Sequence, residues 1–493
     1  PAHIAVQGYL KLAAQGKYRE ALQLIKRENP FPAVCGRICN RRCEDACTRG
    51  TVDQAVAIDE VKRFIAQQDL DAATRFVPEK VIPKVDGAFD QQIAIIGGGP
   101  AGLSCAYYLA EKGYRPTVFE KERRLGGMLE NGLPSFRLEK DVVQAEIDVL
   151  REMGVQFRCG VEVGKDVTIA QLREQGYQGF YVAVGLQSGG RLNIPGDDAQ
   201  GVTAGIDFMR RVNGGQETKL EGRVVVIGGG NIAADVARTA VRCGAESVDL
   251  YCLESYDDMP MGPEDRGECE RDGITIHAGW GQTEIVTENG HAAGIRLRKC
   301  LRVKNDQGRF APEFDDNDTC QAQCATVLYC IGQKVDWRQL LTGTAVTFNP
   351  NGTAQVDPVT YQTAEPDIFA GGDAVTGQKF AIDAIAAGKE GAISLHRFVQ
   401  KATLTIGRNR RQFVELDKEN ALIPVGFDNT PRQQIGYNEA LRRTFRDERI
   451  AFTAQQVQKE TARCLSCGAS VVDPNKCIGC GVCTTKCAFD AIH

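Results

Sequence analysis

The last part of the chain contains a cysteine pattern that binds an iron–sulfur cluster. Its x2, x2, x3 spacing is that of bacterial ferredoxins, whose successive thiolates wrap one 4Fe-4S cube; the ligands would be Cys477, Cys480, Cys483 and Cys487. In two-cluster ferredoxins the fourth cysteine serves the other cluster, so two assignments stay open for Cys487. Cys464 and Cys467 are candidate ligands of a second cluster, although Ser470 breaks the spacing. Zinc bound by four of these cysteines is the alternative.

A second set of cysteines lies near the start of the chain. Its members are Cys35, Cys39, Cys43 and Cys47. Their x3 spacing fits neither the zinc nor the ferredoxin pattern. Most of the other nine of the 19 cysteines are interpreted as small buried hydrophobic residues. Cys320-x3-Cys324 is one such case, so chemistry like that of thioredoxin reductase is a weaker alternative.

The glycine loop at 97–102 has the pattern of a dinucleotide-binding turn. A short apolar strand is expected at 92–96 and a helix from Pro100 and Ala101 onward. Gly97 would form the tight turn, Gly99 would admit a pyrophosphate at the helix N-terminus, and Gly102 would allow close helix–strand packing. A carboxylate for the ribose hydroxyls is expected from Glu120, 23 residues after the first glycine.

A second loop repeats this device about 130 residues later. After a strand at 223–227, Gly228, Gly230, Asn231 and Ile232 follow the G-x-G-x-x-A form. Glu254 comes after the next strand and would favour a free ribose 2′-hydroxyl, and no Lys or Arg lies between residues 248 and 262 to hold a 2′-phosphate. We therefore predict NAD(H) at this loop and FAD at the first.

A third motif completes the predicted flavin site. A strand is expected at 367–373, ending in Gly372 and Asp373, and a helix is expected from Lys379. In flavoenzymes with two dinucleotides, such an aspartate binds the ribityl chain, and the following helix points its N-terminus at the flavin ring. An ordinary turn or helix cap is the alternative for Asp373 alone. Further candidate cofactor contacts are Gly127, Leu129, Arg137, Gly185 and Ala381.

These motifs predict an α/β fold with two Rossmann-like dinucleotide-binding domains, a helical iron–sulfur domain before them and a ferredoxin-like domain after them. The predicted ranges are 1–90 for the helical domain, 91–205 and 341–402 for the two parts of the FAD domain, 206–340 for the NAD(H) domain, 403–460 for a solvated linker arm, and 461–493 for the ferredoxin-like 4Fe-4S domain.

Length and charge agree with a multidomain enzyme. The chain has 493 residues, of which 43% are hydrophobic, and a net charge of −5. This balance argues against nucleic-acid binding. The sequence contains no apolar run long enough for a membrane span and does not begin like a signal peptide, so we expect a cytoplasmic protein.

The run from Phe31 to Cys47 resembles the iron–sulfur segment of the glutamate synthase small subunit, which is shared with the N-terminal part of dihydropyrimidine dehydrogenase. The resemblance extends to about residue 400 and includes both glycine loops, Gly126–Leu129, the turn at Pro134–Arg137 and Gly372-Asp373. It implies that the four cysteines at 35–47 share two 4Fe-4S clusters with cysteines upstream of Pro1. In the family a carboxylate or amide on the next helix can complete one cluster, and Glu60 is the nearest candidate because Lys62 cannot serve.

This sequence departs from the family in two ways. The family's glutamate synthase members carry an Arg pair where Leu253 and Glu254 stand, and the family core lacks the tail at 464–487. No glutaminase or synthase barrel is present, so the resemblance implies that the catalytic end station lies on a partner chain in a hetero-oligomer.

We interpret the chain as an FAD-dependent, NAD(H)-linked electron-transfer subunit. NADH would reduce the flavin, and single electrons would pass through the clusters to or from a partner redox enzyme or ferredoxin. Two alternatives stay open. One is an electron-bifurcating NAD:ferredoxin oxidoreductase subunit, and the other is a non-catalytic relay subunit with a vestigial NAD site.

Overall fold

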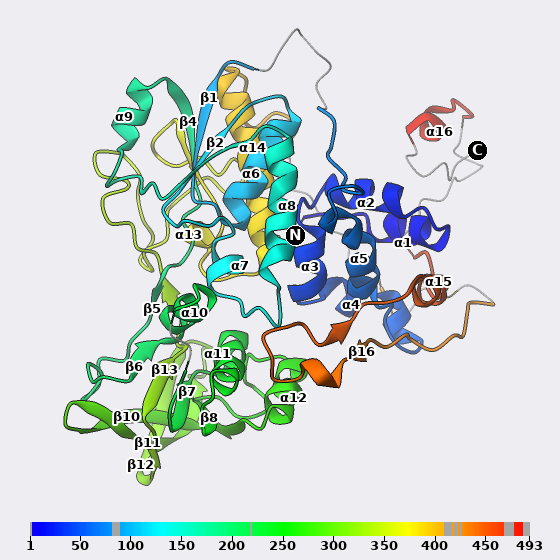
Figure 1. Ribbon diagram of the computed structural model, residues 1–493. Helices are drawn as coiled ribbons and strands as arrows, with labels where there is room; N and C mark the ends of the chain where they lie inside the picture. The colour runs from blue at the N-terminus through cyan, green and yellow to red at the C-terminus, as the bar shows by residue number, and fades with distance from the viewer. Residues whose placement is uncertain are drawn as a thin grey trace.

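Two five-stranded parallel sheets form the centre of the computed structural model (Figure 1). The structure describes residues 2–80, 89–216, 219–408, 417–418, 423, 426–467 and 478–486. The first sheet has the order β15-β4-β1-β2-β3 and the second the order β6-β13-β7-β8-β9. These sheets, with helical segments from the two ends of the chain beside them, confirm the predicted fold class.

The first sheet combines two distant parts of the sequence. Its strands are β1 (Gln92–Ile96), β2 (Thr117–Glu120), β3 (Gln156–Cys159), β4 (Tyr177–Val182) and β15 (Ile368–Ala370). Ile96 pairs with both Phe119 and Val182, so the carboxyl ends of three strands meet at one edge. Helices α6 (Pro100–Glu111) and α14 (Ala381–Val399) pack together and against this sheet. Because both faces of a parallel sheet are covered, β1 is almost continuously apolar.

The second sheet carries the second glycine loop. Its strands are β6 (Val202–Ala204), β7 (Arg223–Ile227), β8 (Ser247–Cys252), β9 (Thr275–Ala278) and β13 (Thr326–Tyr329). It is flanked by α10 (Gly205–Asn213), α11 (Asn231–Arg242) and α12 (Pro263–Arg271). A three-stranded antiparallel sheet extends this unit through β10 (Trp280–Glu288), β11 (His291–Lys304) and β12 (Phe310–Gln323).

The helical N-terminal module packs beside the first sheet. Its helices are α1 (Val6–Ala14), α2 (Tyr18–Lys26), α3 (Pro32–Ile38), α4 (Arg42–Asp45) and α5 (Ile58–Ala66). Helix α8 (Lys140–Glu152) of the first sheet unit contacts α3. There the two carboxyl oxygens of Glu146 accept hydrogen bonds from the backbone N–H groups of Ala33 and Val34 at the N-terminus of α3, at 2.7 and 2.9 Å.

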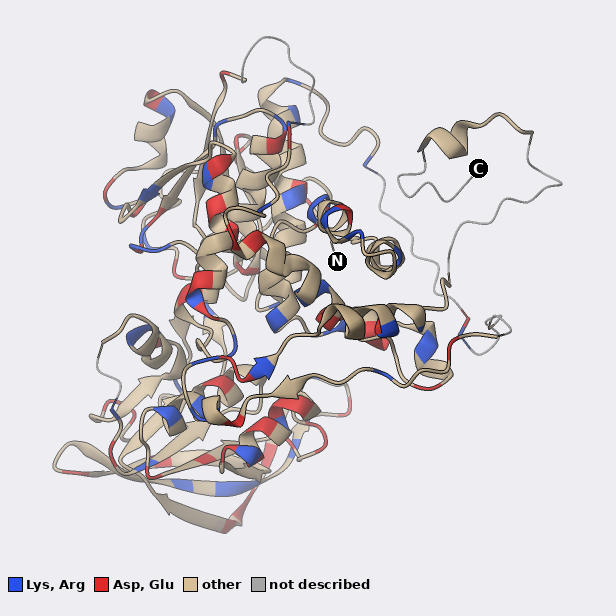
Figure 2. Cartoon of the chain, turned by 45° about the vertical axis from the view of Figure 1, so that its right-hand side comes forward, with Lys and Arg blue, Asp and Glu red and all other residues tan. Residues whose placement is uncertain are grey.

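The predicted solvated arm instead returns to the helical module. Helix α15 (Ala454–Ala462) packs against α1 and α5, and Val457 and Phe452 are buried in the same core as Tyr9. The charged composition of this segment suggested exposure, but its charged groups are buried in pairs: Arg463 and Glu460, both 0% exposed, lie 2.7 Å apart. The segment that contains the short strands β16 (Gly436–Tyr437) and β17 (Arg449–Ile450) extends from the helical module toward α12. Acidic and basic residues lie side by side there (Figure 2).

The remaining elements are short. They are α7 (Met128–Asn131), α9 (Ile169–Glu174), α13 (Asp373–Thr376), α16 (Val482–Lys486), β5 (Ser188–Gly189) and β14 (Gln333–Lys334), with 3-10 turns at Thr48–Thr51, Gln67–Leu70 and Glu439–Leu441. Within the described part of the chain, no helix has the length and apolar character needed to cross a membrane.

Candidate flavin, nicotinamide and iron–sulfur site

A cavity of about 840 Å³ opens where the two sheet units and the helical module meet. Most of the predicted cofactor residues line it: Gly97, Gly99, Pro100, Ala101, Glu120, Gly127, Leu129, Arg137, Gly185, Asn231, Ile232, Gly372, Asp373 and Ala381. Gly230 lines an adjoining cavity of about 380 Å³, together with Asn231 and Ile232. Gly102, Gly228 and Glu254 line neither cavity. The structure therefore brings both glycine loops and the Gly-Asp motif to one space.

The first glycine loop has the backbone that a dinucleotide requires. Gly97 has φ +110°, and a Cβ there would lie 2.4 Å from the Ala183 carbonyl oxygen. A Cβ on Gly102 would lie 2.0 Å from the Gly97 carbonyl oxygen, so this glycine is required by helix–strand packing. Gly99 differs, because its Cβ would meet only the Gly127 Cα, at 3.8 Å. The protein does not need a glycine at position 99 for its own packing, which leaves the loop open to a pyrophosphate at the N-terminus of α6.

Glu120 is held at the end of β2 by backbone donors. One carboxylate oxygen accepts from the Gly98 N–H at 2.7 Å and the other from the Glu122 N–H at 2.9 Å. The side chain is buried, and burial raises the pKa of this carboxyl while the two N–H donors lower it. The arrangement fixes a carboxylate beside the glycine loop, where ribose hydroxyls can donate to it.

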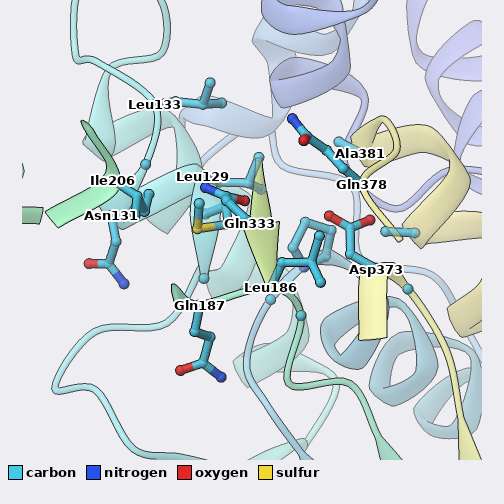
Figure 3. Close-up of a pocket in the computed structure, with 18 of the residues that line it drawn as sticks. Leu129, Asn131, Leu133, Leu186, Gln187, Ile206, Gln333, Asp373, Gln378 and Ala381 are labelled. Carbon is cyan, nitrogen blue, oxygen red and sulfur yellow. The ribbon is translucent and has the colours of Figure 1, made fainter. Parts of the chain in front are cut away.

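Asp373 lines the same cavity from the start of α13. Figure 3 shows Asp373, Gln378 and Ala381 on one side, with Leu129, Asn131 and Ile206 across from them. Burial raises the pKa of the Asp373 carboxyl to about 6, while a backbone N–H from Lys379 lowers it. Gly372 has φ +70°, and its Cβ would lie 2.9 Å from that of Ala101. This close approach brings Asp373 beside the helix that follows the first glycine loop.

The second loop repeats the geometry of the first. Gly228 has φ +141°, and its Cβ would lie 2.5 Å from the Cys330 carbonyl oxygen, whereas a Cβ on Gly230 would meet nothing within 4 Å. A Cβ on Gly229 would lie 2.8 Å from a Glu254 carboxylate oxygen, as one on Gly98 would lie 3.1 Å from Glu120. The two acids thus stand in equivalent places beside their loops.

A lysine near Glu254 was missed by sequence reasoning. The Nζ of Lys299, on β11, lies 3.2 Å from the position of a Cβ on Gly279, whose N–H donates to the Glu254 carbonyl oxygen at 2.8 Å. Lys299 lies outside the segment 248–262 that follows the second loop in sequence, and it reaches this edge from a different sheet. The pairing of β11 with β10 brings it there, which local sequence does not reveal.

Arg137 connects the flavin unit to the nicotinamide unit. Its guanidinium lies 2.6 Å from Asp235 and 2.5 Å from Asp265, both on helices of the second sheet unit. Burial raises the pKa of Asp235 to about 6, although the positive charge of Arg137 lowers it. Arg137 also lines the large cavity, so a contact with the cofactor would share this guanidinium with the two carboxylates.

The N-terminal cysteines border the same cavity. Cys39 is the cysteine among its described lining residues, and it follows α3 directly. Lys62 is buried on α5 and is 2.5 Å from Asp59. Helices α3 and α5 pack closely where a Cβ on Gly36 would lie 2.7 Å from the Arg63 Cα. The neighbouring ammonium of Lys62 acts on the thiol of Cys35, one residue before this glycine.

Two thiols show the effect of this buried ammonium. Burial raises the pKa of Cys35 and of Cys43 to about 12, and the positive charge of Lys62 lowers each. Glu60, the candidate oxygen ligand, is also buried and lies 3.5 Å from Arg41. Thiols with a neighbouring cation fit an anionic iron–sulfur cluster, which binds through thiolates.

The tail is described only in part. Cys480 and Cys483 are exposed, whereas Cys477 and Cys487 lie outside the described residues. Over the described ranges, no three ligand-type side chains converge on a single metal ion. Thiolates of a cube bind different irons, so their sulfurs are further apart than the ligands of one ion.

Fold and site together define a two-dinucleotide oxidoreductase with iron–sulfur modules, and comparison with known sequences agrees. The pyridine nucleotide-disulphide oxidoreductase family matches residues 91–388. Residues 1–74 match dihydropyrimidine dehydrogenase domain II, a 4Fe-4S cluster domain, and residues 470–493 match a 4Fe-4S binding domain. The chain therefore belongs to the pyridine nucleotide-disulphide oxidoreductase family and carries a 4Fe-4S module at each end.

Similar proteins support the same grouping. The beta subunit of an NADP(+)-dependent formate dehydrogenase from Moorella thermoacetica is 34% identical over 95% of this chain and 69% of its own length. The small chain of a glutamate synthase [NADPH] from Halomonas elongata is 33% identical over 79% of this chain and 84% of its own length. FprA from Mycobacterium tuberculosis shares the fold, with a TM-score of 0.56, 18% identity, and coverage of 65% of this chain and 87% of its own. The predicted resemblance is confirmed.

Proposed function

We propose that the chain is an FAD-dependent electron-transfer subunit that takes electrons from a pyridine nucleotide and passes them through iron–sulfur clusters to a catalytic redox partner or to ferredoxin. One observation carries the proposal: Gly97 and Gly99 of the first glycine loop, Asn231 and Ile232 of the second, and Cys39 all border a single cavity. When bound, FAD supplies two-electron chemistry toward a nicotinamide and one-electron chemistry toward a cluster. The cavity is therefore bordered by a flavin loop, a nicotinamide loop and a cysteine of the iron–sulfur module, which are the three sites that this conversion needs.

The chain's own residues have binding roles in this proposal. Gly99 and Gly230 would admit the two pyrophosphates, and Glu120 would accept from the ribose of FAD. Asp373 would hold the ribityl chain, and the N-terminus of α14 at Ala381, which lines the cavity, would contribute to holding the flavin. No protein group needs to exchange a proton with a substrate, because hydride transfer uses only the two cofactors.

We further propose that the nicotinamide is NADH. Glu254 supports this, because its carboxylate stands beside the second loop as Glu120 does beside the first. A carboxylate at this position repels a 2′-phosphate, and it stands where a basic residue would otherwise donate a charge-assisted hydrogen bond to that phosphate. Together these two effects favour binding of NADH over NADPH on the order of 100-fold. The relatives named above carry NADP(+) or NADPH in their names. If the nucleotide were NADPH, the cation proposed to bind its 2′-phosphate would be Lys299, which lies near the backbone of Glu254.

Electron transfer is tested by anaerobic reduction of the purified protein with NADH, followed by flavin absorbance and by EPR of the clusters. In a Cys39→Ser variant we expect normal flavin reduction and slower appearance of reduced cluster. Cys159→Ser is the matched control, because Cys159 is exposed and does not line the cavity. A protein without flavin, or one whose flavin is not reduced by either nucleotide, would contradict the proposal.

The preference for NADH is tested by kcat/KM for dye reduction with each nucleotide. Leu253→Arg combined with Glu254→Arg should shift the preference toward NADPH, whereas Glu246→Arg, which changes an exposed carboxylate just before β8, should not. Equal kcat/KM values in the unmodified protein, or a preference for NADPH, would refute the assignment. Loss of an NADPH preference in Lys299→Ala would identify this lysine as the phosphate-binding group.

The proposed partner is a catalytic redox subunit in a hetero-oligomer. Support comes from two relatives that are themselves subunits, the beta subunit of a formate dehydrogenase and the small chain of a glutamate synthase. Native mass measurement of the protein isolated from its own cells is the test, and a homogeneous species containing only this chain would count against a partner subunit.

A further inference from the structure

Phe380 is a large apolar residue that lies exposed at the site rather than in the core. It is 38% exposed, and it lines both the cavity of about 840 Å³ and the adjoining cavity of about 380 Å³. Ile206, Asn231, Gln333 and Gln378 also line both cavities, and no other described residue shared by the two carries an aromatic ring. The shared residues mark the passage from one cavity to the other.

The start of α14 does not account for an aromatic side chain at this position. Phe380 directly precedes α14, and its backbone N–H donates to the Asp383 carboxylate at 3.3 Å. Any residue with a backbone N–H could make this bond, whereas Ser, Thr, Asp and Asn are preferred at such a position because their side chains cap the helix. A phenyl ring has no oxygen with which to cap, so the helix does not require it.

A residue of the iron–sulfur module contacts the ring. The Arg42 guanidinium carbon lies 5.0 Å from the centre of the Phe380 ring, within the range of a cation–π interaction. A guanidinium nitrogen of Arg42 also lies 3.7 Å from Asp383, so the three side chains form one cluster. Arg42 begins α4 and stands between Cys39 and Cys43. The ring is therefore tied to the helical module while it borders both cavities.

A ligand that extends from the smaller cavity into the larger one must pass this ring. Gly230 and Ile232 of the second loop line the smaller cavity, and the proposed function assigns that loop to a nicotinamide nucleotide. Hydride transfer requires the reacting atoms to lie about 3–3.5 Å apart, so the nicotinamide must reach from its own loop to the flavin. An exposed aromatic ring in the passage offers a flat apolar surface on which a planar heterocycle can stack.

We propose that Phe380 contacts the nicotinamide ring of the bound nucleotide and positions it in the passage between the two cavities, and that Arg42 fixes the Phe380 ring. The assignment rests on the proposed function and deepens it, because it identifies a side chain that acts on the nicotinamide end of the nucleotide. It also connects the nucleotide site to the loop that carries Cys39 and Cys43.

The test compares ligands with and without the nicotinamide ring. NAD+ and ADP-ribose share the adenine, both riboses and the pyrophosphate, and NADP+ and 2′-phospho-ADP-ribose are the equivalent pair. Isothermal titration of the full-length protein, purified with its flavin and clusters, gives the Kd of each member of the pair that the unmodified protein binds. In Phe380→Ser the Kd of the dinucleotide should rise about tenfold, and the Kd of the ligand without nicotinamide should not change. Serine is a preferred helix cap, so α14 should remain stable in this variant.

Three further variants complete the comparison. Phe380→Tyr keeps the ring and should bind both ligands as the unmodified protein does. Arg42→Gln should raise the Kd of the dinucleotide by a smaller factor, about two- to fivefold, with flavin and iron content unchanged. Phe310→Ser is the matched control, because Phe310 is 70% exposed on β12 and lines neither cavity.

Three results for Phe380→Ser would overturn the assignment. They are an equal rise in Kd for both ligands, an unchanged Kd for both, and loss of flavin, which would show that the ring contacts FAD instead. An unchanged Kd of the dinucleotide in Arg42→Gln would refute the role of Arg42. Unmodified protein that binds neither pair of ligands would contradict the proposed function itself.

Discussion

The two glycine loops allow one substitution that separates nucleotide binding from folding. Gly230 has φ −99° and ψ 174°, an extended conformation open to any residue, and a Cβ there would meet no protein atom within 4 Å. Gly230→Ala should therefore fold normally, and the reduced freedom of the unfolded chain favours it by about 0.4–1 kcal/mol. The added methyl group would instead stand where a pyrophosphate approaches the N-terminus of α11.

The expected loss of binding follows from the hydrogen bonds at the loop. A backbone N–H donated to a charged group contributes about 1.5–3 kcal/mol, so loss of one such bond raises KM for the nicotinamide nucleotide about 10- to 150-fold. The assay is steady-state dye reduction, with flavin content and the thermal midpoint measured on the same protein. Flavin content should be unchanged, because FAD is expected at the other loop.

Two matched variants complete this experiment. Gly99→Ala makes the equivalent change at the first loop and should lower flavin content instead. Gly228→Ala should lower the thermal midpoint, because φ is +141° and the new Cβ would lie 2.5 Å from the Cys330 carbonyl oxygen. An unchanged KM for both NADH and NADPH in Gly230→Ala would refute the assignment of the second loop to the nicotinamide nucleotide.

Three further predictions concern single side chains. Asp373→Ala should purify with little FAD while its helices remain intact, as measured by flavin absorbance and far-UV circular dichroism; full flavin content would contradict the ribityl contact. Burial raises the pKa of Glu146 in the folded chain from 4.5 to about 8, so its contribution to stability is complete below pH 4.5 and is lost as the pH rises toward 8. Glu146→Gln should therefore show a flatter dependence of the thermal midpoint on pH between 5 and 8, and an unchanged slope would argue against a protonated carboxyl. Cys324→Ala should leave dye reduction by NADH unchanged, since neither Cys320 nor Cys324 lines the cavity; a large loss would revive a dithiol mechanism.

The sequence predicted the parts of the site that local pattern determines. A short apolar strand, three glycines and a helix form one continuous segment, so both loops could be recognised from neighbouring residues alone. The structure has strands at 92–96 and 223–227, as predicted, and helices that begin at Pro100 and Asn231. Glu120 and Glu254 were also predicted, because the helix and strand that follow each glycine loop have typical lengths and so fix the distance from the loop to the acid.

Features that depend on distant pairing could not be predicted in this way. The charged segment before Cys464 was expected to be solvated, because composition alone does not show that Arg463 and Glu460 bury each other's charge. Lys299 approaches Glu254 from a separate antiparallel sheet. The ion pairs of Arg137 likewise involve Asp235 and Asp265, which follow it by about 100 and about 130 residues. In each case the stabilising contact is made with a residue far away in the sequence, which local periodicity does not identify.

The segment around β17 limits how the two dinucleotide units can move. The Arg449 guanidinium donates at 3.0 Å to the carbonyl oxygens of Arg37, in the helical module, and of Arg137, in the flavin unit. Its neighbour Glu448 lies 2.5 Å from Arg271 on α12 of the nicotinamide unit. Rotation of the nicotinamide unit against the flavin unit would break these partly buried contacts. Arg449 and Glu448 together contact all three parts of the molecule and so hold the two glycine loops and Cys39 around one cavity. The proposed electron transfer would then not require a rotation between the two dinucleotide units.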